Sequence, residues 1–180
     1  MFPTLRRNLL LQLDGKLPNL ALMRLSAFLK QRGEAIEFRR IRSPLMLEHG
    51  LFDEGWTSVY ASLIFERTRP VAERLRQIYP GAIIGGTGWD RRTRLEQIGV
   101  TTQALDYSLY PDYPHSIGFS QRGCRLRCPF CVVPDKEGRV TEERPIAEIW
   151  RGDPSPRNVL LLDNDFFGAP QWRERVEELR

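Results

Sequence analysis

Short apolar runs alternate with amphipathic stretches over the first hundred residues. The run "NLLLQLD" is almost continuously apolar, as in a strand buried on both faces of a parallel sheet. Four segments are predicted strands: 8–14, 35–41, 58–65 and 81–88. Three segments are predicted helices: 18–31, 70–79 and 91–98. In the first helix Leu22, Leu25 and Leu29 repeat at helical spacing and form one apolar face. This order predicts an α/β fold with a doubly wound, Rossmann-like parallel sheet over residues 1–105.

The pattern changes at residues 106–114, "DYSLYPDYP", which have two prolines and no helical period. We interpret them as a linker between two domains. Beyond it the chain predicts a strand at 116–119, a helix at 144–150, a strand at 158–165 and a helix at 170–180. The second domain, residues 115–180, would then hold two β/α units and end inside a helix. Because two units make too little sheet to cover both faces, we expect an unfinished domain.

Composition is ordinary for a water-soluble globular protein, with 41% hydrophobic and 28% charged residues. The apolar runs are too short to cross a bilayer, and the first residues lack the pattern of a secretory signal, so we expect a cytoplasmic protein without a membrane partner. The 27 basic residues are interleaved with 23 acidic ones, and a nucleic-acid partner is not indicated. Phosphate-loop and dinucleotide fingerprints are absent from the sequence.

All three cysteines lie within eight positions, at Cys124, Cys128 and Cys131. A closed zinc site needs four ligands, and His115, nine residues before the first cysteine, could supply the fourth, whereas His49 is distant. Three cysteines are also enough for a 4Fe-4S cluster, because three thiolates hold three irons and leave one iron open. An open metal position is what a catalytic centre keeps.

The segment Cys124-Arg-Leu-Arg-Cys128-Pro-Phe130-Cys131 resembles the Cx3CxΦC signature of the radical S-adenosylmethionine (radical SAM) superfamily, in which Φ is aromatic. The resemblance covers roughly residues 115–180 and implies the first part of a (β/α) barrel that carries a 4Fe-4S cluster. It implies that the open iron binds S-adenosylmethionine, which is reductively cleaved to a 5′-deoxyadenosyl radical. It further implies that Phe130 lies against the adenine, and that a flavodoxin- or ferredoxin-like protein supplies electrons. The substrate is not implied.

The second strand of such barrels carries residues near the methionine ammonium group, often Gly-Gly-Glu. Asp163, Asn164 and Asp165 stand there in this chain, which is similar to acidic variants in cobalamin-associated members. The resemblance implies that at least one of them contacts S-adenosylmethionine, since carboxylate and amide oxygens accept from ammonium groups. The alternative is an ordinary polar turn between strand and helix.

The first domain resembles the cobalamin-binding-like domain that many superfamily members carry. Some cobalamin proteins have a DxHxxG sequence after the first strand, but this chain has Asp14-Gly-Lys16-Leu-Pro18 and lacks the histidine. Either cobalamin binds without a protein ligand or the domain is a scaffold, and we favour the scaffold. Two other functions stay open: an iron–sulfur electron carrier and a zinc-stabilised α/β binding module. Because superfamily barrels have about six β/α units, we expect poor turnover unless a second chain completes the barrel.

Overall fold

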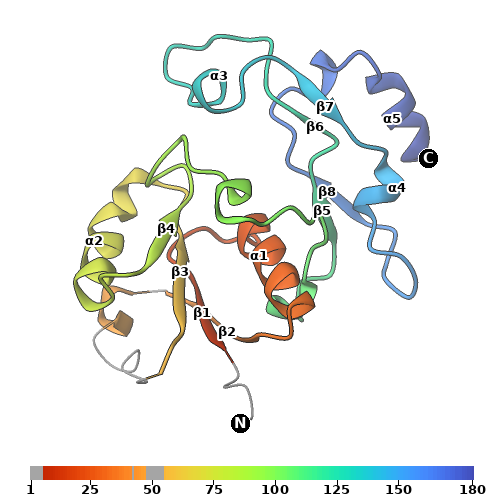
Figure 1. Cartoon of the computed structure of the whole chain (residues 1–180). Helices are drawn as coiled ribbons and strands as arrows, with labels where there is room; N and C mark the ends of the chain where they lie inside the picture. The colour runs from red at the N-terminus through yellow and green to blue at the C-terminus, as the bar shows by residue number, and fades with distance from the viewer. Residues whose placement is uncertain (1–5, 42, 48–54) are drawn as a thin grey trace. The chain divides into compact units, whose positions relative to one another are not determined.

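The computed structural model describes residues 6–41, 43–47 and 55–180, and the chain forms two compact units (Figure 1). Unit 1 is Met1–Tyr110 and unit 2 is Pro111–Arg180. The division falls inside the segment 106–114 that we interpreted as a linker. Residues 106–110 therefore belong to unit 1 rather than to a free connection.

Unit 1 contains a four-stranded parallel sheet in the order β2-β1-β3-β4 (Figure 1). Its strands are β1 (Arg7–Gln12), β2 (Ala35–Arg40), β3 (Ser58–Ser62) and β4 (Ile83–Gly85). Its α-helices are α1 (Leu20–Gln31) and α2 (Arg69–Ile78), with 3-10 turns at Pro44–Leu47, Glu66–Thr68, Leu95–Ile98 and Tyr107–Leu109. The prediction of an α/β fold with a parallel sheet is confirmed for this unit.

Alternate residues of β1 face two separate apolar cores, as the two-residue period of a strand requires. Leu9 and Leu11 pack in the core that contains Leu75 of α2. Leu10 packs with the α1 leucines, such as Leu25, on the opposite face. The two helices thus cover different faces of the sheet, and all three β1 leucines are completely buried.

Helix α1 begins where a polar side chain can cap it. The Asn19 carboxamide oxygen accepts from the backbone N–H of Leu22 at 3.2 Å, which satisfies one of the donors left free at a helix start. The expected helix at 91–98 is mostly irregular, because only Leu95–Ile98 forms a 3-10 turn. Asp90 holds the preceding chain in a turn by accepting from the Arg92 N–H and the Thr93 hydroxyl.

Residues 106–110 are tied to unit 1 by polar contacts that a linker would lack. Asp106 accepts hydrogen bonds from the Ser26 hydroxyl at 2.5 Å and pairs with Lys30 at 2.7 Å. Tyr110 is buried, and its ring meets Phe38 of β2 edge-on with 5.0 Å between centroids. These contacts fix the end of unit 1 at Tyr110.

Unit 2 contains a parallel pair of strands and an antiparallel pair. The parallel pair is β5 (Ser116–Gly118) with β8 (Val159–Leu161), and the antiparallel pair is β6 (Gln121–Arg122) with β7 (Thr141–Glu143). The helices are α3 (Val133–Lys136), α4 (Ile146–Ile149) and α5 (Trp172–Glu178). The strands β5 and β8 and the helices α4 and α5 occupy the segments where the sequence predicts two β/α units, whereas β6, β7 and α3 were not expected.

Helix α4 lies so close to β5 that no side chain fits between them. A Cβ added to Gly118 would lie 2.8 Å from the Ile149 side chain, so this strand position requires glycine. Ile146 and Ile149 of α4 and Ile117 of β5 are all buried, and α4 contacts β5. The carboxyl end of β5 is thereby fixed immediately before the cysteine segment.

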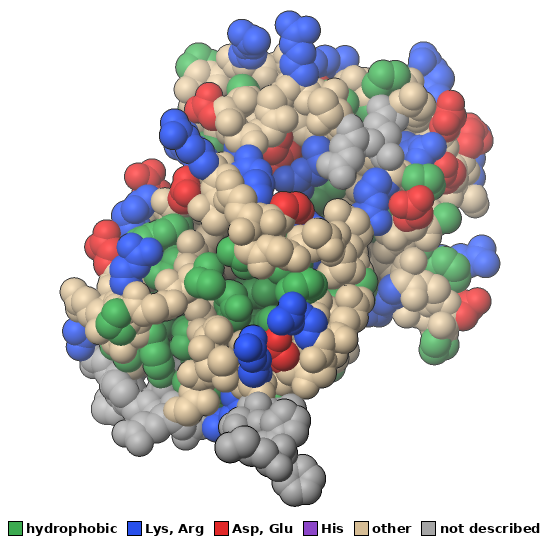
Figure 2. Space-filling model, viewed as in Figure 1, with side chains coloured by type: hydrophobic (Ala, Val, Ile, Leu, Met, Phe, Trp, Pro, Cys, Tyr) green, Lys and Arg blue, Asp and Glu red, His purple; other side chains and the backbone are tan. Residues whose placement is uncertain are grey.

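Charged side chains of both signs are interspersed on the viewed face of each unit (Figure 2). This agrees with the alternation of basic and acidic residues along the sequence. In the part of the chain that the structure describes, none of the helices has the length and apolar character needed to cross a bilayer.

Candidate functional site

The three cysteines lie on one loop, residues 123–140, which joins β6 to β7. Pairing of Arg122 with Thr141 closes the base of this loop, which we call the Cys loop. Cys124, Cys128 and Cys131 are partly buried thiols, and none forms a disulfide. One loop therefore carries all three thiols, within eight residues of the chain.

Gly123 makes the sharp entry into the Cys loop possible. Its φ of +85° is in the left-handed region, and a Cβ there would lie 2.1 Å from the Arg139 carbonyl oxygen. The next residue, Cys124, donates its N–H to the Gly138 carbonyl at 3.1 Å. Entry and exit of the loop are thus in direct backbone contact.

Two further hydrogen bonds shape the loop around its sulfurs. The N–H of Leu126 donates to the Cys124 sulfur at 3.4 Å. The N–H of Cys131 donates to the Cys128 carbonyl at 3.0 Å and closes a tight turn around Phe130. Phe130 is 90% exposed, the value expected for a side chain available to a planar ligand rather than to a core.

Glu137 joins the Cys loop to two other segments. One carboxylate oxygen accepts from the Arg122 guanidinium at 2.6 Å, and the other accepts from the Gly123 N–H at 3.1 Å and the Asn164 amide at 3.0 Å. The side chain is only 9% exposed. The sequence gives no signal for this residue, because it belongs to no motif and its partner Asn164 is 27 positions away.

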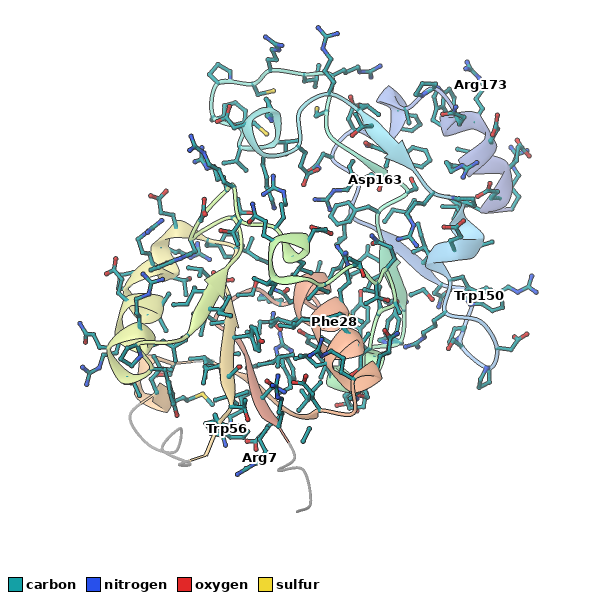
Figure 3. The ribbon with its side chains drawn as sticks, viewed as in Figure 1. Arg7, Phe28, Trp56, Trp150, Asp163 and Arg173 are labelled. Atoms are coloured by element: carbon teal, nitrogen blue, oxygen red, sulfur yellow. The ribbon has the colours of Figure 1, made fainter. Side chains whose placement is uncertain are left out.

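Asp163, labelled in Figure 3, follows β8 and binds the chain at the start of β6. Its carboxylate accepts from the Ser120 N–H at 2.8 Å and the Gln121 N–H at 3.3 Å, and also from the Ser120 hydroxyl. The resemblance implies a place for Asp163 near the methionine ammonium group; in the structure its partners are the residues that lead into the Cys loop. Its carboxylate is occupied by the protein's own donors.

Asp165 and Asn164 reach the Cys loop at two other points. Asp165 accepts from the backbone N–H of Arg125 at 3.1 Å and pairs with the Arg125 guanidinium at 3.3 Å. Asn164 is exposed and donates its amide to Glu137. Among the described residues, the carbonyl oxygen of the Asn164 side chain accepts no hydrogen bond. Of the three polar residues after β8, Asn164 is the one that presents an unused acceptor at the surface.

Gln121, which sequence reasoning missed, is buried three residues before Cys124 and is only 1% exposed. Neither its carboxamide oxygen nor its nitrogen has a partner in the part of the chain that the structure describes. Buried polar groups are nearly always paired, so an unpaired carboxamide next to the Cys loop is typical of a site that is completed by another group.

His115, the alternative fourth zinc ligand, lies at the wrong end of β5. It precedes the strand, whereas the Cys loop follows the strand's carboxyl end, and three extended residues span roughly 10 Å. Its ring packs edge-on against Tyr113, with 5.6 Å between centroids. The structure therefore does not bring His115 to the cysteines, and His49 lies outside the described residues.

The donor set of the Cys loop fits an iron–sulfur cluster in kind and in number. It offers three thiols on one loop, a backbone N–H directed at a sulfur, and the unpaired Gln121 carboxamide nearby. Among the described residues, no three His, Cys, Asp or Glu side chains form a preassembled metal site. Binding of a cluster would therefore require the loop to draw its sulfurs together, as metal-coupled folding commonly does.

The carboxyl edge of the unit 1 sheet is filled by the unit's own polar groups. The Tyr110 hydroxyl donates to the Gln12 carboxamide at 2.7 Å and accepts from the Asn19 N–H at 3.0 Å. Asn19 also donates to the Ser62 hydroxyl at 2.9 Å. Asp14 accepts from the N–H groups of the two residues after Leu63, at 2.7 and 2.9 Å. Burial raises the pKa of Tyr110 to about 12, so its hydroxyl stays protonated.

Comparison of the chain with protein-family models, with curated proteins and with solved structures found no match.

Proposed function

We propose that the chain is a radical SAM protein whose Cys loop binds a 4Fe-4S cluster and S-adenosylmethionine. The observation that carries the proposal is the Cx3CxΦC segment, Cys124 to Cys131, on a loop that two residues after β8 contact, Asn164 through Glu137 and Asp165 through Arg125. Ligands of open parallel sheets bind beyond the carboxyl ends of adjacent strands, which is where this loop lies.

In this proposal Cys124, Cys128 and Cys131 hold three irons as thiolates and leave the fourth iron for the methionine amino and carboxylate groups. When bound, the cluster would supply the electron for reductive cleavage of S-adenosylmethionine to a 5′-deoxyadenosyl radical. The exposed ring of Phe130 would lie against the adenine. An external one-electron donor of the flavodoxin or ferredoxin type would reduce the centre, and the substrate is left open.

Asn164 is the residue after β8 that we assign to the methionine ammonium group. Its side-chain oxygen is directed to no described partner, whereas the carboxylates of Asp163 and Asp165 already bind Ser120 and Arg125. An amide oxygen that accepts from an ammonium group suits this role. Asp163 and Asp165 would instead hold the Cys loop against β8.

For unit 1 we propose a Rossmann-like scaffold, related to cobalamin-binding domains in form but without the cofactor. The support is the hydrogen-bonded group of Gln12, Asn19, Ser62 and Tyr110, which fills the carboxyl edge of the sheet. A cofactor tail that entered there would have to break these buried hydrogen bonds, at a cost of about 1–3 kcal/mol for each group left unpaired.

Anaerobic reconstitution with iron and sulfide tests the proposal. We expect about four irons and four sulfides per chain and loss of both in Cys124→Ala, Cys128→Ala or Cys131→Ala. Addition of S-adenosylmethionine to the reduced protein should change the electron paramagnetic resonance spectrum of the cluster. Bound zinc without iron would instead favour the zinc-stabilised module, and a cluster that ignores S-adenosylmethionine would favour an electron carrier. Incubation with hydroxocobalamin should leave no bound corrinoid.

A further inference from the structure

Glu137 lies where three parts of unit 2 meet. It is the residue after α3, so it marks the exit of the Cys loop, and its carboxylate contacts the loop entry at Arg122 and Gly123. The same carboxylate accepts from Asn164 after β8. One nearly buried side chain therefore joins the two ends of the Cys loop and the turn that carries the proposed ammonium acceptor.

An ionised carboxylate can only accept hydrogen bonds, and this fixes the orientation of the Asn164 side chain. The amide nitrogen of Asn164 must face Glu137, at 3.0 Å. The carbonyl oxygen, on the other branch of the planar amide, must then point away from Glu137. Glu137 thus determines which end of the Asn164 carboxamide is presented to a ligand.

We propose that Glu137 is a positioning residue: it closes the Cys loop and presents the Asn164 side-chain oxygen to the ammonium group of S-adenosylmethionine. The ammonium part of this inference depends on the proposed function, whereas the loop-closing part does not. Glu137 itself touches neither cofactor, and it acts through Gly123 and Asn164.

Exchange of donor and acceptor tests the orientation. Glu137→Gln keeps one acceptor oxygen, which we expect to face the charged Arg122 guanidinium, so the new amide nitrogen faces the Gly123 N–H and Asn164. The Asn164 carboxamide then turns over and presents its nitrogen to the ligand. We expect the affinity of the reconstituted protein for S-adenosylmethionine to fall about tenfold or more, the usual effect of losing a hydrogen bond to a charged group, while the iron content is kept. Asn164→Ala, a change at an exposed residue, should weaken binding similarly.

The double variant Glu137→Gln with Asn164→Asp restores a donor at 137 and an acceptor at 164. We expect it to recover most of the lost affinity, which a merely structural role of Glu137 would not predict. The matched control is Glu148→Gln, which changes an exposed glutamate paired with Arg144 outside the loop. Wild-type affinity in Glu137→Gln, or no recovery in the double variant, would overturn the orientation argument.

Hydrogen exchange of the cluster-free chain tests the loop closure separately. In Glu137→Ala the backbone amide of Gly123 loses its acceptor, so its exchange should accelerate at least about tenfold, with no change in Glu148→Ala. An unchanged exchange rate of the Gly123 amide would overturn the loop-closing role of Glu137, even if the wild-type protein binds a cluster. If the wild-type protein took up no cluster, the proposed function and the ammonium role would fall, and the exchange result would still decide whether Glu137 closes the loop.

Discussion

Three adjacent polar residues after β8 perform three different tasks, although their chemistry in the sequence is nearly the same. Asp163 binds Ser120 before β6, Asp165 binds Arg125 of the Cys loop, and Asn164 binds Glu137 while its oxygen stays available. In the sequence the three are equal candidates, because each can accept from an ammonium group. Their partners separate them.

Replacement of Asp163 by alanine should destabilise unit 2. The change leaves the buried Ser120 hydroxyl and N–H without their acceptor, which costs about 1–3 kcal/mol of unfolding free energy. Urea unfolding followed by hydrogen exchange of unit 2 peptides measures the loss. Asp112→Ala, at an exposed position of the same unit, is the control and should be neutral. Equal stability of the two variants would contradict the structural role.

Gly123 and Gly138 provide a matched pair of glycines, because both have positive φ, at +85° and +75°. No described atom lies within 4 Å of a Cβ built on Gly138, whereas a Cβ on Gly123 would strike the Arg139 carbonyl at 2.1 Å. Gly138→Ala should cost about 1 kcal/mol for the left-handed conformation alone. Gly123→Ala should cost clearly more and reduce iron uptake, which thermal unfolding and iron analysis would measure. Similar behaviour of both variants would be evidence against the tight loop entry.

At the scale of elements, a strand can be predicted from the sequence when it carries a run or an alternation of apolar residues. The strands of unit 1 were found because β1 is a run of buried leucines. The strands β6 and β7 have the sequences Gln-Arg and Thr-Glu-Glu, which carry no apolar alternation, and they form because the chain returns on itself. The tyrosines and prolines of residues 106–114 are typical of loops and predict a linker, whereas the buried Tyr110 hydroxyl that ties residues 106–110 to unit 1 leaves no mark in the local sequence.

The contact of residues 106–110 with the sheet should make the stability of unit 1 depend on pH, because Tyr110 can lose its proton. Its pKa is raised by burial to about 12 in the folded chain, above its ordinary value of 10. The folded state therefore holds the proton more tightly, so this contribution to stability is complete below pH 10 and is lost as pH rises toward 12. Tyr110→Phe should abolish that part of the pH dependence of unit 1 unfolding.

The same substitution should lower unit 1 stability at neutral pH by about 1–3 kcal/mol, because Gln12 and Asn19 lose a buried partner. Denaturant unfolding at pH 8 and pH 11 provides both measurements. Tyr107→Phe in the adjacent 3-10 turn is a comparison at a less buried tyrosine. A Tyr110→Phe protein as stable as the wild type would contradict the polar network.

At the scale of the whole molecule, the two units differ in how much apolar surface they bury. Both large apolar cores belong to unit 1. The buried hydrophobic residues described in unit 2 are Ile117, Ile146, Ile149 and Ala169. Because burial of apolar surface is the main stabilising contribution, unit 2 should unfold at a lower urea concentration than unit 1.

Reconstitution with the cluster should then stabilise unit 2 but not unit 1. A cluster that binds only the folded Cys loop raises the free energy of unfolding of the unit that contains this loop. Hydrogen exchange at increasing urea, with and without the cluster, measures both transitions. If the cluster raised the unfolding midpoints of both units equally, selective stabilisation would be contradicted. If unit 1 unfolded at a lower urea concentration than unit 2 in the cluster-free chain, the predicted order of stability would be wrong.

At the site the sequence predicts cysteine ligands for a cluster, which stays a prediction, but it does not predict the contacts that hold their loop. The spacing of Cys124, Cys128 and Cys131 is local and therefore visible in the sequence. The contacts that hold their loop join residues far apart, with 43 positions between Ser120 and Asp163 and 27 between Glu137 and Asn164. Such pairings depend on the neighbouring positions of β5 and β8, which no single segment encodes.

The pairing of β6 with β7 makes the cysteine-bearing segment a closed appendage with its two ends side by side. Lengthening such a segment at its outer part leaves the positions of its ends unchanged, and each doubling of loop length costs only about 0.6 kcal/mol in closure entropy. Insertions beside Glu137 would disturb its contacts with the loop entry, whereas insertions among the exposed residues 125–127 would leave those contacts in place and change the spacing of Cys124 and Cys128 and the Arg125–Asp165 pairing. The fold thus separates the closure of the loop from the spacing of its sulfurs, so each can be changed without the other.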